Sequence, residues 1–575
     1  MILMFVSAAA EVLSLGAVVP FIGVLTAPEL AFRNRFIAAA AHAWGVHSAA
    51  QLVLPLAVAF AVAAVGSGAI RMAFLWASTR LTFAAGADLS IEVYRRTLYQ
   101  PYPVHVARGS SEVISGLTNK TGTTVLGVML PLMTLISSAV VLVAVMLALL
   151  AIDASVALVA AVGFGGSYWL ITLLFRRRLQ LNSRRVADEY TRVVKTLQEG
   201  LGGIRDVLLD GTQEAYCLAY RQADLVFRVA QGENVFIGQS PRYVMESLGM
   251  VLIAVLALGL SRRSGGVAAA LPMLGALALG AQRLLPTLQQ SYSAWANIAG
   301  SHAALADTVE LLEQPVSAHL LSPPPAPLPL REAIRFQAVR FRYSADGPWV
   351  LDGVDLSIPK GARVGLVGGT GSGKSTALDL MMGLLTPVAG EILIDGEPLA
   401  GERVRAWQRT IAHVPQNVFL ADTTLAENIA FGIPRDRIDM ERVRLAARNA
   451  QIAEFIEGGA RGYDARVGER GVQLSGGQRQ RIGIARALYK KATVLVLDEA
   501  TSALDNLTER AVMNAIETLD RGLTIVLIAH RLTTVQHCDA IVELRQGQIV
   551  AQGRFEQLLE SSQTFRQMAH ATQTA

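Results

Sequence analysis

Long apolar segments recur in the first half of the chain and constrain its fold more than any other feature. They lie at residues 1–25, 52–76, 125–152, 154–175, 244–260 and 267–285. At about 20 residues, each is long enough to cross the hydrocarbon core of a membrane as a helix. Since backbone polar groups must be paired inside lipid, we expect six transmembrane helices. The composition, 52% hydrophobic and 17% charged over 575 residues, agrees with a chain that is partly embedded in a membrane.

Arginines give these helices a direction. The third and fourth segments meet at Asp153 in a short turn without Lys or Arg, whereas the fourth ends in FRRRLQLNSRR and leads into an arginine-rich helical stretch, 176–228. A second basic stretch contains Arg95 and Arg96. Because Lys and Arg favour cytoplasmic loops, we expect both connections, and with six spans both chain ends, in the cytoplasm. No Lys or Arg precedes the first span, which disfavours a secretory signal peptide.

Cysteine usage and net charge exclude several other classes. Cys217 and Cys538 lie far apart without metal-ligand spacing, so neither a disulfide framework nor a zinc site is predicted. The net charge of +5 is small for this length, and the clustered arginines indicate membrane orientation rather than nucleic-acid binding. The proline-rich run LSPPPAPLPLRE predicts an extended connector. We therefore place a membrane domain at 1–314, a linker at 315–332 and an α/β domain at 333–575.

The second domain contains a glycine-rich phosphate loop. The stretch ARVGLVGGTGSGKSTALDLMMGLL has the pattern of a strand, the spacing GxxxxGKS and a helix. Backbone N–H groups of such a loop surround phosphates, while Lys374 would neutralise them and Ser375 would bind Mg²⁺. The predicted phosphate-binding residues are Gly368, Gly369, Thr370, Gly371, Ser372, Gly373, Lys374, Ser375 and Thr376.

Two acidic residues end another apolar strand, in TVLVLDEATSALD. Because α/β sheets bind ligands at the carboxyl ends of their strands, we expect Asp498 to hold Mg²⁺ and Glu499 to act as the base that polarises the attacking water. A surface acidic pair is the alternative. The strand TIVLIAH, which ends at His530 in an equivalent position, argues against that alternative.

Together with LSGGQ at Leu474–Gln478, these motifs resemble the ATP-binding cassette family over nearly the whole second domain. The resemblance implies that two cassettes pair head to tail, and that the signature residues of one chain contact the ATP held by the phosphate loop of the other. Those residues are Ser475, Gly476, Gly477 and Gln478. We therefore expect a homodimer with two competent sites for ATP hydrolysis. The expected cofactors are ATP and Mg²⁺.

The same resemblance assigns roles to four further residues. Tyr343 would stack on adenine, and Gln416 would contact Mg²⁺ and the attacking water. Asp505 would sense the opposite site, and His530 the γ-phosphate. A soluble cassette protein acting on ribosomes or DNA would share these motifs but not the membrane spans.

The first half resembles the exporters of this family. The fusion of membrane domain and cassette, the two long cytoplasmic connections and VGERG at Val467–Gly471 carry the likeness. It implies an α-helical six-span transmembrane domain of exporter type followed by an α/β P-loop domain. The expected location is a bacterial inner membrane with the cassette in the cytoplasm.

Charged residues inside the spans are candidates for substrate binding. Arg71, Arg242 and Arg283 lie within or at the edge of predicted spans, as does Glu246. An arginine near mid-bilayer costs about 2.5–3.5 kcal/mol, so such residues face a wet cavity or a partner. Arg242 and Glu246 could simply pair at i, i+4, and Arg71 could reach the inner headgroups. Alternatively, the three arginines bind an anionic headgroup.

Three short stretches narrow the substrate by resemblance. EVLSLGAVVPFIGVL, QSPRYVMESLG and AQRLLPTLQQSYS resemble lipid-linked oligosaccharide flippases of the protein-glycosylation type (PglK-like). This implies transfer of a polyprenyl-pyrophosphate oligosaccharide from the cytoplasmic to the outer leaflet. Export of another lipid, a peptide or a drug is the alternative.

Overall fold

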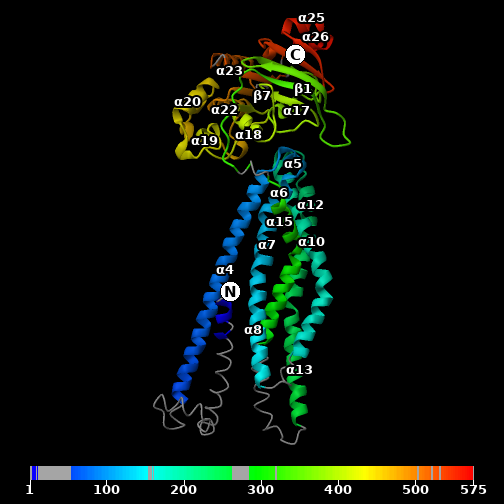
Figure 1. The fold of residues 1–575 in the computed structure, drawn as a ribbon, viewed down its shortest axis with the longest axis vertical. Coiled ribbons are helices and arrows are strands. Elements are labelled where there is room, and N and C mark those ends of the chain that lie inside the picture. Colours follow the sequence, from blue (N-terminus) through cyan, green and yellow to red (C-terminus); the bar gives the residue numbers. More distant parts are fainter. Residues whose placement is uncertain are drawn as a thin grey trace. The chain divides into compact units, whose positions relative to one another are not determined.

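The computed structural model describes residues 3–7, 9–10, 53–152, 158, 161–261, 284–316, 320, 322–500, 504–519, 522–529 and 532–573. The chain divides into two compact units. The membrane unit comprises Met1–Gln100 and His105–Pro315, and the cassette unit comprises Pro101–Val104 and Val316–Ala575. The described part of the membrane unit is helical, whereas the cassette unit contains two sheets (Figure 1).

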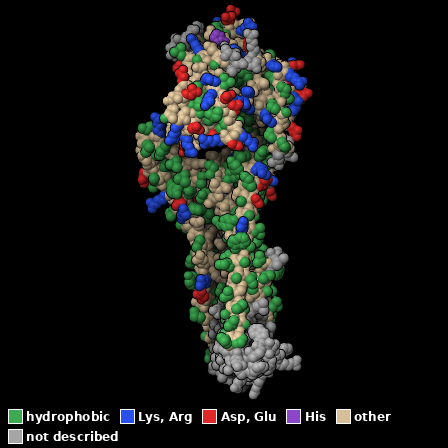
Figure 2. Space-filling model, turned by 90° about the vertical axis from the view of Figure 1, so that its left-hand side faces the viewer, with side chains coloured by type: hydrophobic (Ala, Val, Ile, Leu, Met, Phe, Trp, Pro, Cys, Tyr) green, Lys and Arg blue, Asp and Glu red, His purple; other side chains and the backbone are tan. Residues whose placement is uncertain are grey.

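Long helices lie side by side in the membrane unit (Figure 1). They are α4 (Val53–Leu98), α8 (Leu130–Ile152), α10 (Gly166–Gly202), α12 (Gln213–Gln239), α13 (Pro241–Ser261), a helix at 284–300 and α15 (His302–Glu313). Hydrophobic side chains cover most of the described surface of these helices on the face in Figure 2. Among the described residues, Ala57–Leu98 and Ser110–Leu147 are long and apolar enough to cross a membrane. The count of six spans stays a prediction, because residues 11–52 and 262–283 lie outside the described part of the chain.

The second of these stretches is one continuous helix with two π-helical turns. It runs through α6 (Ser110–Ser115), η2 (Gly116–Lys120), α7 (Thr121–Thr124), η3 (Val125–Met129) and α8. Glycine allows this helix to approach its neighbours closely. A Cβ on Gly127 would lie 2.2 Å from Ser301 Oγ, and one on Gly86 of α4 would lie 2.7 Å from Val125 Cγ2. Larger residues at these two positions would therefore push the helices apart.

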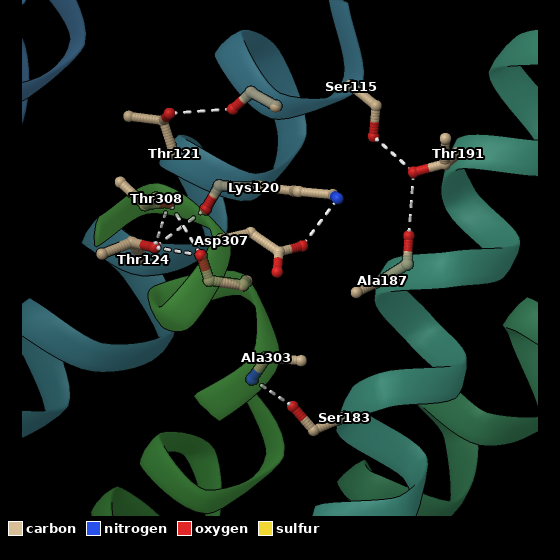
Figure 3. A network of polar contacts seen from close by, with 12 residues as sticks. Ser115, Lys120, Thr121, Thr124, Ser183, Ala187, Thr191, Ala303, Asp307 and Thr308 are labelled. Carbon is tan, nitrogen blue, oxygen red and sulfur yellow. Dashed lines mark hydrogen bonds and ion pairs between the residues drawn. The ribbon is translucent and has the colours of Figure 1, made fainter. Parts of the chain in front are cut away.

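Polar contacts join three helical segments near the π-helical turns (Figure 3). Lys120 and Asp307 form an ion pair of 2.6 Å, and the hydroxyls of Thr124 and Thr308 lie 3.0 Å apart. The contacts to α10 are Ser115 Oγ to Thr191 Oγ1 at 3.2 Å and Ala303 N to Ser183 Oγ at 2.8 Å. Since buried polar groups are costly unless paired, these contacts specify how α6, α7, α10 and α15 pack together.

The cassette unit contains one antiparallel and one mostly parallel sheet. The first has the order β2-β1-β4-β5, with β1 (Ala333–Phe341), β2 (Leu351–Pro359), β4 (Ala389–Ile394) and β5 (Glu397–Pro398). The second has the order β10-β9-β3-β8-β7-β6. Its strands are β3 (Arg363–Val367), β6 (Ile411–Val414), β7 (Val494–Asp498), β8 (Thr524–Ile528), β9 (Ala540–Arg545) and β10 (Gln548–Gly553). Neighbouring strands of this sheet are parallel except β9 and β10, which are antiparallel.

Helices cover the parallel sheet, so its central strands are mostly apolar. All of β8 is buried, as expected for a strand with both faces covered. The covering helices include α17 (Lys374–Met381), α18 (Glu402–Thr410), α22 (Gly476–Tyr489) and α23 (Asn506–Leu519), and α20 (Met440–Asn449) packs against α22. Trp407 of α18 is fully buried, and its indole Nε1 donates to Met381 O at 2.8 Å. This contact attaches α18 to the helix that follows the phosphate loop.

Shorter helices complete the cassette unit. They are α19 (Leu425–Ile429), α21 (Ala453–Glu457), α24 (Leu532–Val535), α25 (Phe555–Ser561) and α26 (Gln563–Gln573). In the membrane unit, α11 (Ile204–Leu209) links α10 to α12. The helix α5 (Tyr102–Ala107) follows α4, and its residues are divided between the two units.

Candidate functional site

The phosphate loop connects β3 to α17 and has a backbone that only glycine adopts easily. The φ angles are 147° at Gly368, 77° at Gly371 and 101° at Gly373. A Cβ on Gly368 would lie 2.2 Å from the carbonyl oxygen of Leu544 in β9. The loop is therefore packed against the neighbouring strand, and its curvature depends on these glycines.

Lys374 begins α17 and folds its side chain over the loop. Its Nζ donates to Gly368 O and Gly369 O, both at 2.9 Å, and the residue is 7% exposed. Burial lowers the pKa of the Lys374 ammonium, while the carboxylates of Glu499 and Asp498 act in the opposite direction. The cation is thus held at the loop within reach of both acidic residues.

The two acidic residues lie at the carboxyl end of β7. Asp498 is paired with Ile528 of β8, and the Glu499 N–H donates to Ile528 O at 3.1 Å. Gln416 Nε2 donates to Glu499 Oε2 at 2.6 Å. Gln416 and Glu499, predicted separately, are therefore in direct contact.

Asp379 is a neighbour of this site that sequence reasoning missed. It lies on α17, five residues after Lys374. Partial burial, together with the charge of Asp498, raises the pKa of its carboxyl to about 6. The available signal was an acidic residue within the otherwise apolar helix ALDLMM.

Tyr343, the predicted adenine contact, is 62% exposed. Its ring packs edge-on against Phe341 at 5.0 Å, and its hydroxyl lies 3.1 Å from Thr376 Oγ1. The side chain is thereby attached to the first turn of α17. Its stacking on adenine stays a prediction.

The signature residues form the N-terminus of α22. Ser475 is the N-cap: its Oγ accepts from Gln478 N at 3.2 Å, and its own N–H donates to Gln478 Oε1 at 2.8 Å. Gly476 and Gly477 form the first turn, where backbone N–H groups favour anions. Gln480, which the sequence reasoning missed, is 4% exposed and donates to Glu499 O at 3.5 Å. It links the signature helix to the acidic end of β7.

Asp505 caps α23. Its carboxylate accepts from the Thr508 hydroxyl at 2.7 Å, from Thr508 N at 2.9 Å and from Leu507 N at 3.1 Å, and these hydrogen bonds lower its pKa. One turn later Glu509, 6% exposed, accepts from Thr534 Oγ1 of α24 at 2.5 Å. His530 lies outside the described residues, two positions before α24 begins at Leu532. Glu509 had not been singled out from the sequence.

In the membrane unit, Arg71 and Arg242, two of the three predicted substrate arginines, line different cavities. Arg71 lines a cavity of about 710 Å³, together with Ser78, Thr134 and other polar side chains. Arg242 lines a second cavity of about 370 Å³, where its Nε donates to Glu246 Oε1 at 2.8 Å. The i, i+4 pairing considered from the sequence is therefore formed. Arg283 lies outside the described residues.

Comparison with known proteins assigns the family. The family described as ABC transporter transmembrane region matches residues 11–233, and the family described as ABC transporter matches residues 351–502. An ATP-dependent lipid A-core flippase of Chromohalobacter salexigens is 37% identical over 415 residues, covering 68% of this chain and 69% of that protein. The chain belongs to the ABC transporter family. A Cupriavidus metallidurans protein of the same name is 34% identical over 443 residues, covering 74% of this chain and 72% of that one.

The fold of this ABC transporter is that of an exporter. It is similar to a bacterial Atm1-family ABC exporter with ATP bound, with a TM-score of 0.83 and 24% identity over 100% of this chain and 98% of that one. The predicted family and the predicted architecture, a helical membrane domain followed by a P-loop cassette, are confirmed. With one domain of each kind the chain is a half-transporter, a membrane protein that couples ATP hydrolysis to export. The roles of individual site residues stay predictions.

Proposed function

We propose that this ABC exporter moves a lipid-linked anionic saccharide, a polyprenyl-pyrophosphate oligosaccharide, from the cytoplasmic to the outer leaflet of a bacterial inner membrane. The observation that carries the proposal is the position of Arg71 in the lining of a membrane-unit cavity. Arg71 lies in a predicted span and lines a cavity of about 710 Å³ whose other lining residues include several hydroxyls and Gln290. A guanidinium in such a cavity suits phosphate, which accepts hydrogen bonds from it bidentately.

The position of Arg71 along α4 suits a lipid headgroup. Arg71 is 18 residues after Val53, where α4 begins. At about 1.5 Å per residue this is ~27 Å, close to the thickness of the hydrocarbon core. With the predicted orientation, Arg71 lies near the level of the inner leaflet headgroups, where a cytoplasmic-side lipid would present its phosphates.

The cassette residues fit ATP and Mg²⁺. Asp498 and Ser375 offer a carboxylate and a hydroxyl, which are oxygen ligands of the kind Mg²⁺ takes. Bound ATP would supply the phosphoryl group whose hydrolysis drives transport. Lys374 would donate to its phosphates, and Glu499 would accept the proton of the attacking water. The contact from Gln416 to Glu499 at 2.6 Å supports a role for Gln416 in orienting that base.

Two copies of the chain are needed for this chemistry in our proposal. The signature residues Ser475–Gln478 of one copy would complete the site at the phosphate loop of the other. The α22 N-terminus supports this, because its backbone N–H groups and the Ser475 cap form an end suited to anions. A homodimer would then hold two equivalent sites.

A second candidate substrate is lipid A-core. Relatives that this chain matches over 69% and 72% of their length are named lipid A-core flippases. Both candidates require an ATP-driven lipid flippase. They differ in the lipid that the membrane cavities accept.

The test is translocation in proteoliposomes. Purified protein is reconstituted with a fluorescent polyprenyl-pyrophosphate oligosaccharide or with labelled lipid A-core, and ATP-dependent loss of quencher accessibility is followed. Glu499→Gln serves as the control, because removing a general base lowers turnover by about 10²–10⁴-fold while ATP binding persists. We expect movement of the polyprenyl lipid by the wild type alone. Movement of lipid A-core only would replace the first substrate by the second, and movement of neither would refute both.

A further inference from the structure

The backbone of Glu499 is held in an unfavourable conformation by a side chain of another helix. We infer that this side chain, Gln480 of α22, is a positioning residue that fixes where Glu499 presents its carboxylate. The inference rests on the proposed function, in which Glu499 accepts the proton of the attacking water. It adds a residue that acts through Glu499 rather than on ATP.

The strain lies at Glu499 itself. Its φ angle is 50°, in the left-handed region that favours glycine. A residue with a Cβ stays in such a conformation only where the surrounding structure fixes it, and residues of this kind are concentrated at active sites. The contacts of the Glu499 peptide groups therefore decide whether its side chain keeps its position.

Both peptide groups of Glu499 are hydrogen-bonded. Its N–H donates to Ile528 O of β8 at 3.1 Å, and its carbonyl oxygen accepts from Gln480 Nε2 at 3.5 Å. The first bond belongs to the parallel sheet, whereas the second comes from a side chain of α22. A bond of 3.5 Å is long, and hydrogen bonds of catalytic sites commonly shorten when substrate closes the site. On its carbonyl side, the conformation of Glu499 thus depends on Gln480.

Gln480 is held firmly enough to act in this way. It is 4% exposed and lies on the buried face of α22. Gly483, one turn further on, brings this helix close to β6 and the segment after it. A Cβ on Gly483 would lie 2.7 Å from Val418 Cγ2 and 3.4 Å from Val414 Cγ1. Because interiors are closely packed, α22 has little freedom to shift relative to these residues.

The same packing supports the partner of the Glu499 carboxylate. Gln416 lies between Val414 and Val418 in the chain, and its Nε2 donates to Glu499 Oε2 at 2.6 Å. One helix, α22, therefore contacts the segment that contains the donor and the backbone of the acceptor. Without the Gln480 amide, the backbone of Glu499 would relax and its carboxylate would move. A misplacement of about 1 Å can lower turnover about 10²-fold.

The experiment measures ATP turnover and fluorescent-ATP binding on the reconstituted full-length protein. Gln480→Met keeps the length of the side chain and removes the amide. The matched control is Gln408→Met on α18, because the Gln408 amide also donates to a backbone carbonyl, Gly383 O, at 3.2 Å. Glu499→Gln and the double variant Gln480→Met/Glu499→Gln complete the set, with single-turnover hydrolysis used for the slow variants.

We expect Gln480→Met to lower kcat about 10- to 100-fold and to leave the Kd for ATP within about 2-fold of the wild type. Gln408→Met should stay close to the wild type in both. The double variant should hydrolyse ATP as slowly as Glu499→Gln and no slower. A residue that acts through the base has no further effect once the base is removed.

Gln480→Asn gives a second measurement that does not depend on tolerance of methionine at this buried position. It keeps a polar amide but is shorter by one methylene, so it cannot span a distance that is already 3.5 Å. The same loss of kcat with unchanged ATP binding is expected.

Three results would contradict the reasoning, and they differ from one another. Normal kcat in both Gln480 variants would overturn the positioning role and leave the proposed function standing. A double variant slower than Glu499→Gln would overturn it too, because Gln480 would then act independently of Glu499. Normal turnover in Glu499→Gln would instead refute the role of Glu499 as the base in the proposed function.

Discussion

Thr534→Val removes the hydroxyl that donates to Glu509 and keeps the size of the side chain. The Glu509 carboxylate is 6% exposed and lies 2.5 Å from Thr534 Oγ1. A hydrogen bond to a charged group contributes about 1.5–3 kcal/mol, and the loss of the donor leaves a buried carboxylate oxygen poorly satisfied. We expect Thr534→Val to lower the free energy of unfolding by that amount. Thr534→Ser, which keeps the hydroxyl, should stay close to the wild type.

The contact is isolated by a double-mutant cycle. Glu509→Met should cost at least as much as Thr534→Val, because Glu509 makes a further interaction. The double variant should cost less than the two single variants together, since the second substitution removes a partner that is already gone. A coupling of about 1–2 kcal/mol is expected for residues in direct contact.

The assay is urea unfolding of the full-length protein in detergent, with ATP turnover measured on the same samples. Because α24 begins two residues after His530, we expect turnover to fall in both single variants. A coupling below about 0.3 kcal/mol would refute the reasoning, because it would mean that the two side chains act independently.

Three further substitutions test other parts of the structure. The pKa of Asp379 is raised to about 6 in the folded protein, so ionisation of this carboxyl lowers the free energy of unfolding fully above pH 6 and not at all below about pH 4. Asp379→Asn should therefore have a higher free energy of unfolding than the wild type above pH 6, by on the order of 2 kcal/mol. This difference should vanish towards pH 4. Gly368→Ala should weaken fluorescent-ATP binding more than about 10-fold (~1.4 kcal/mol), because its Cβ meets a backbone carbonyl. The Cβ of Gly369→Ala would meet no atom within 4 Å, so this variant should bind ATP nearly normally. Equal binding of ATP by the two variants would contradict the loop geometry. Gly127→Ala should destabilise the protein in detergent by about 1–3 kcal/mol through overpacking, and Gly122→Ala, with nothing within 4 Å, should not; equal melting temperatures would count against the close helix approach.

Local chemistry explains why the cassette motifs were predictable. The phosphate loop needs glycine at Gly368, Gly371 and Gly373 for its backbone and a lysine directly after them, so its spacing is visible in the chain itself. The end of β7 is equally local, since a buried strand followed by Asp498 and Glu499 places both acids at one edge of the sheet.

Other features depend on tertiary packing and were not predictable. Glu509 and Thr534 are 25 positions apart, and only the packing of α23 against α24 brings them together. The raised pKa of Asp379 comes from burial and from the charge of Asp498, which is distant in the chain. For Arg242, the i, i+4 spacing to Glu246 permitted either pairing or substrate binding, and side-chain geometry was needed to show the pair.

The π-helical turns η2 and η3 make the helix at 110–152 sensitive to the length of the chain. A π-helical turn accommodates about one residue more than an α-helical turn, and one residue corresponds to about 100° of rotation in an α-helix. Deleting one residue between 116 and 129 would restore an α-helical turn and rotate Thr134 and Ser138 away from the cavity they line. Single-residue insertions and deletions there would thus offer evolution a way to change which side chains meet the substrate while the contacts of Ser115 stay in place.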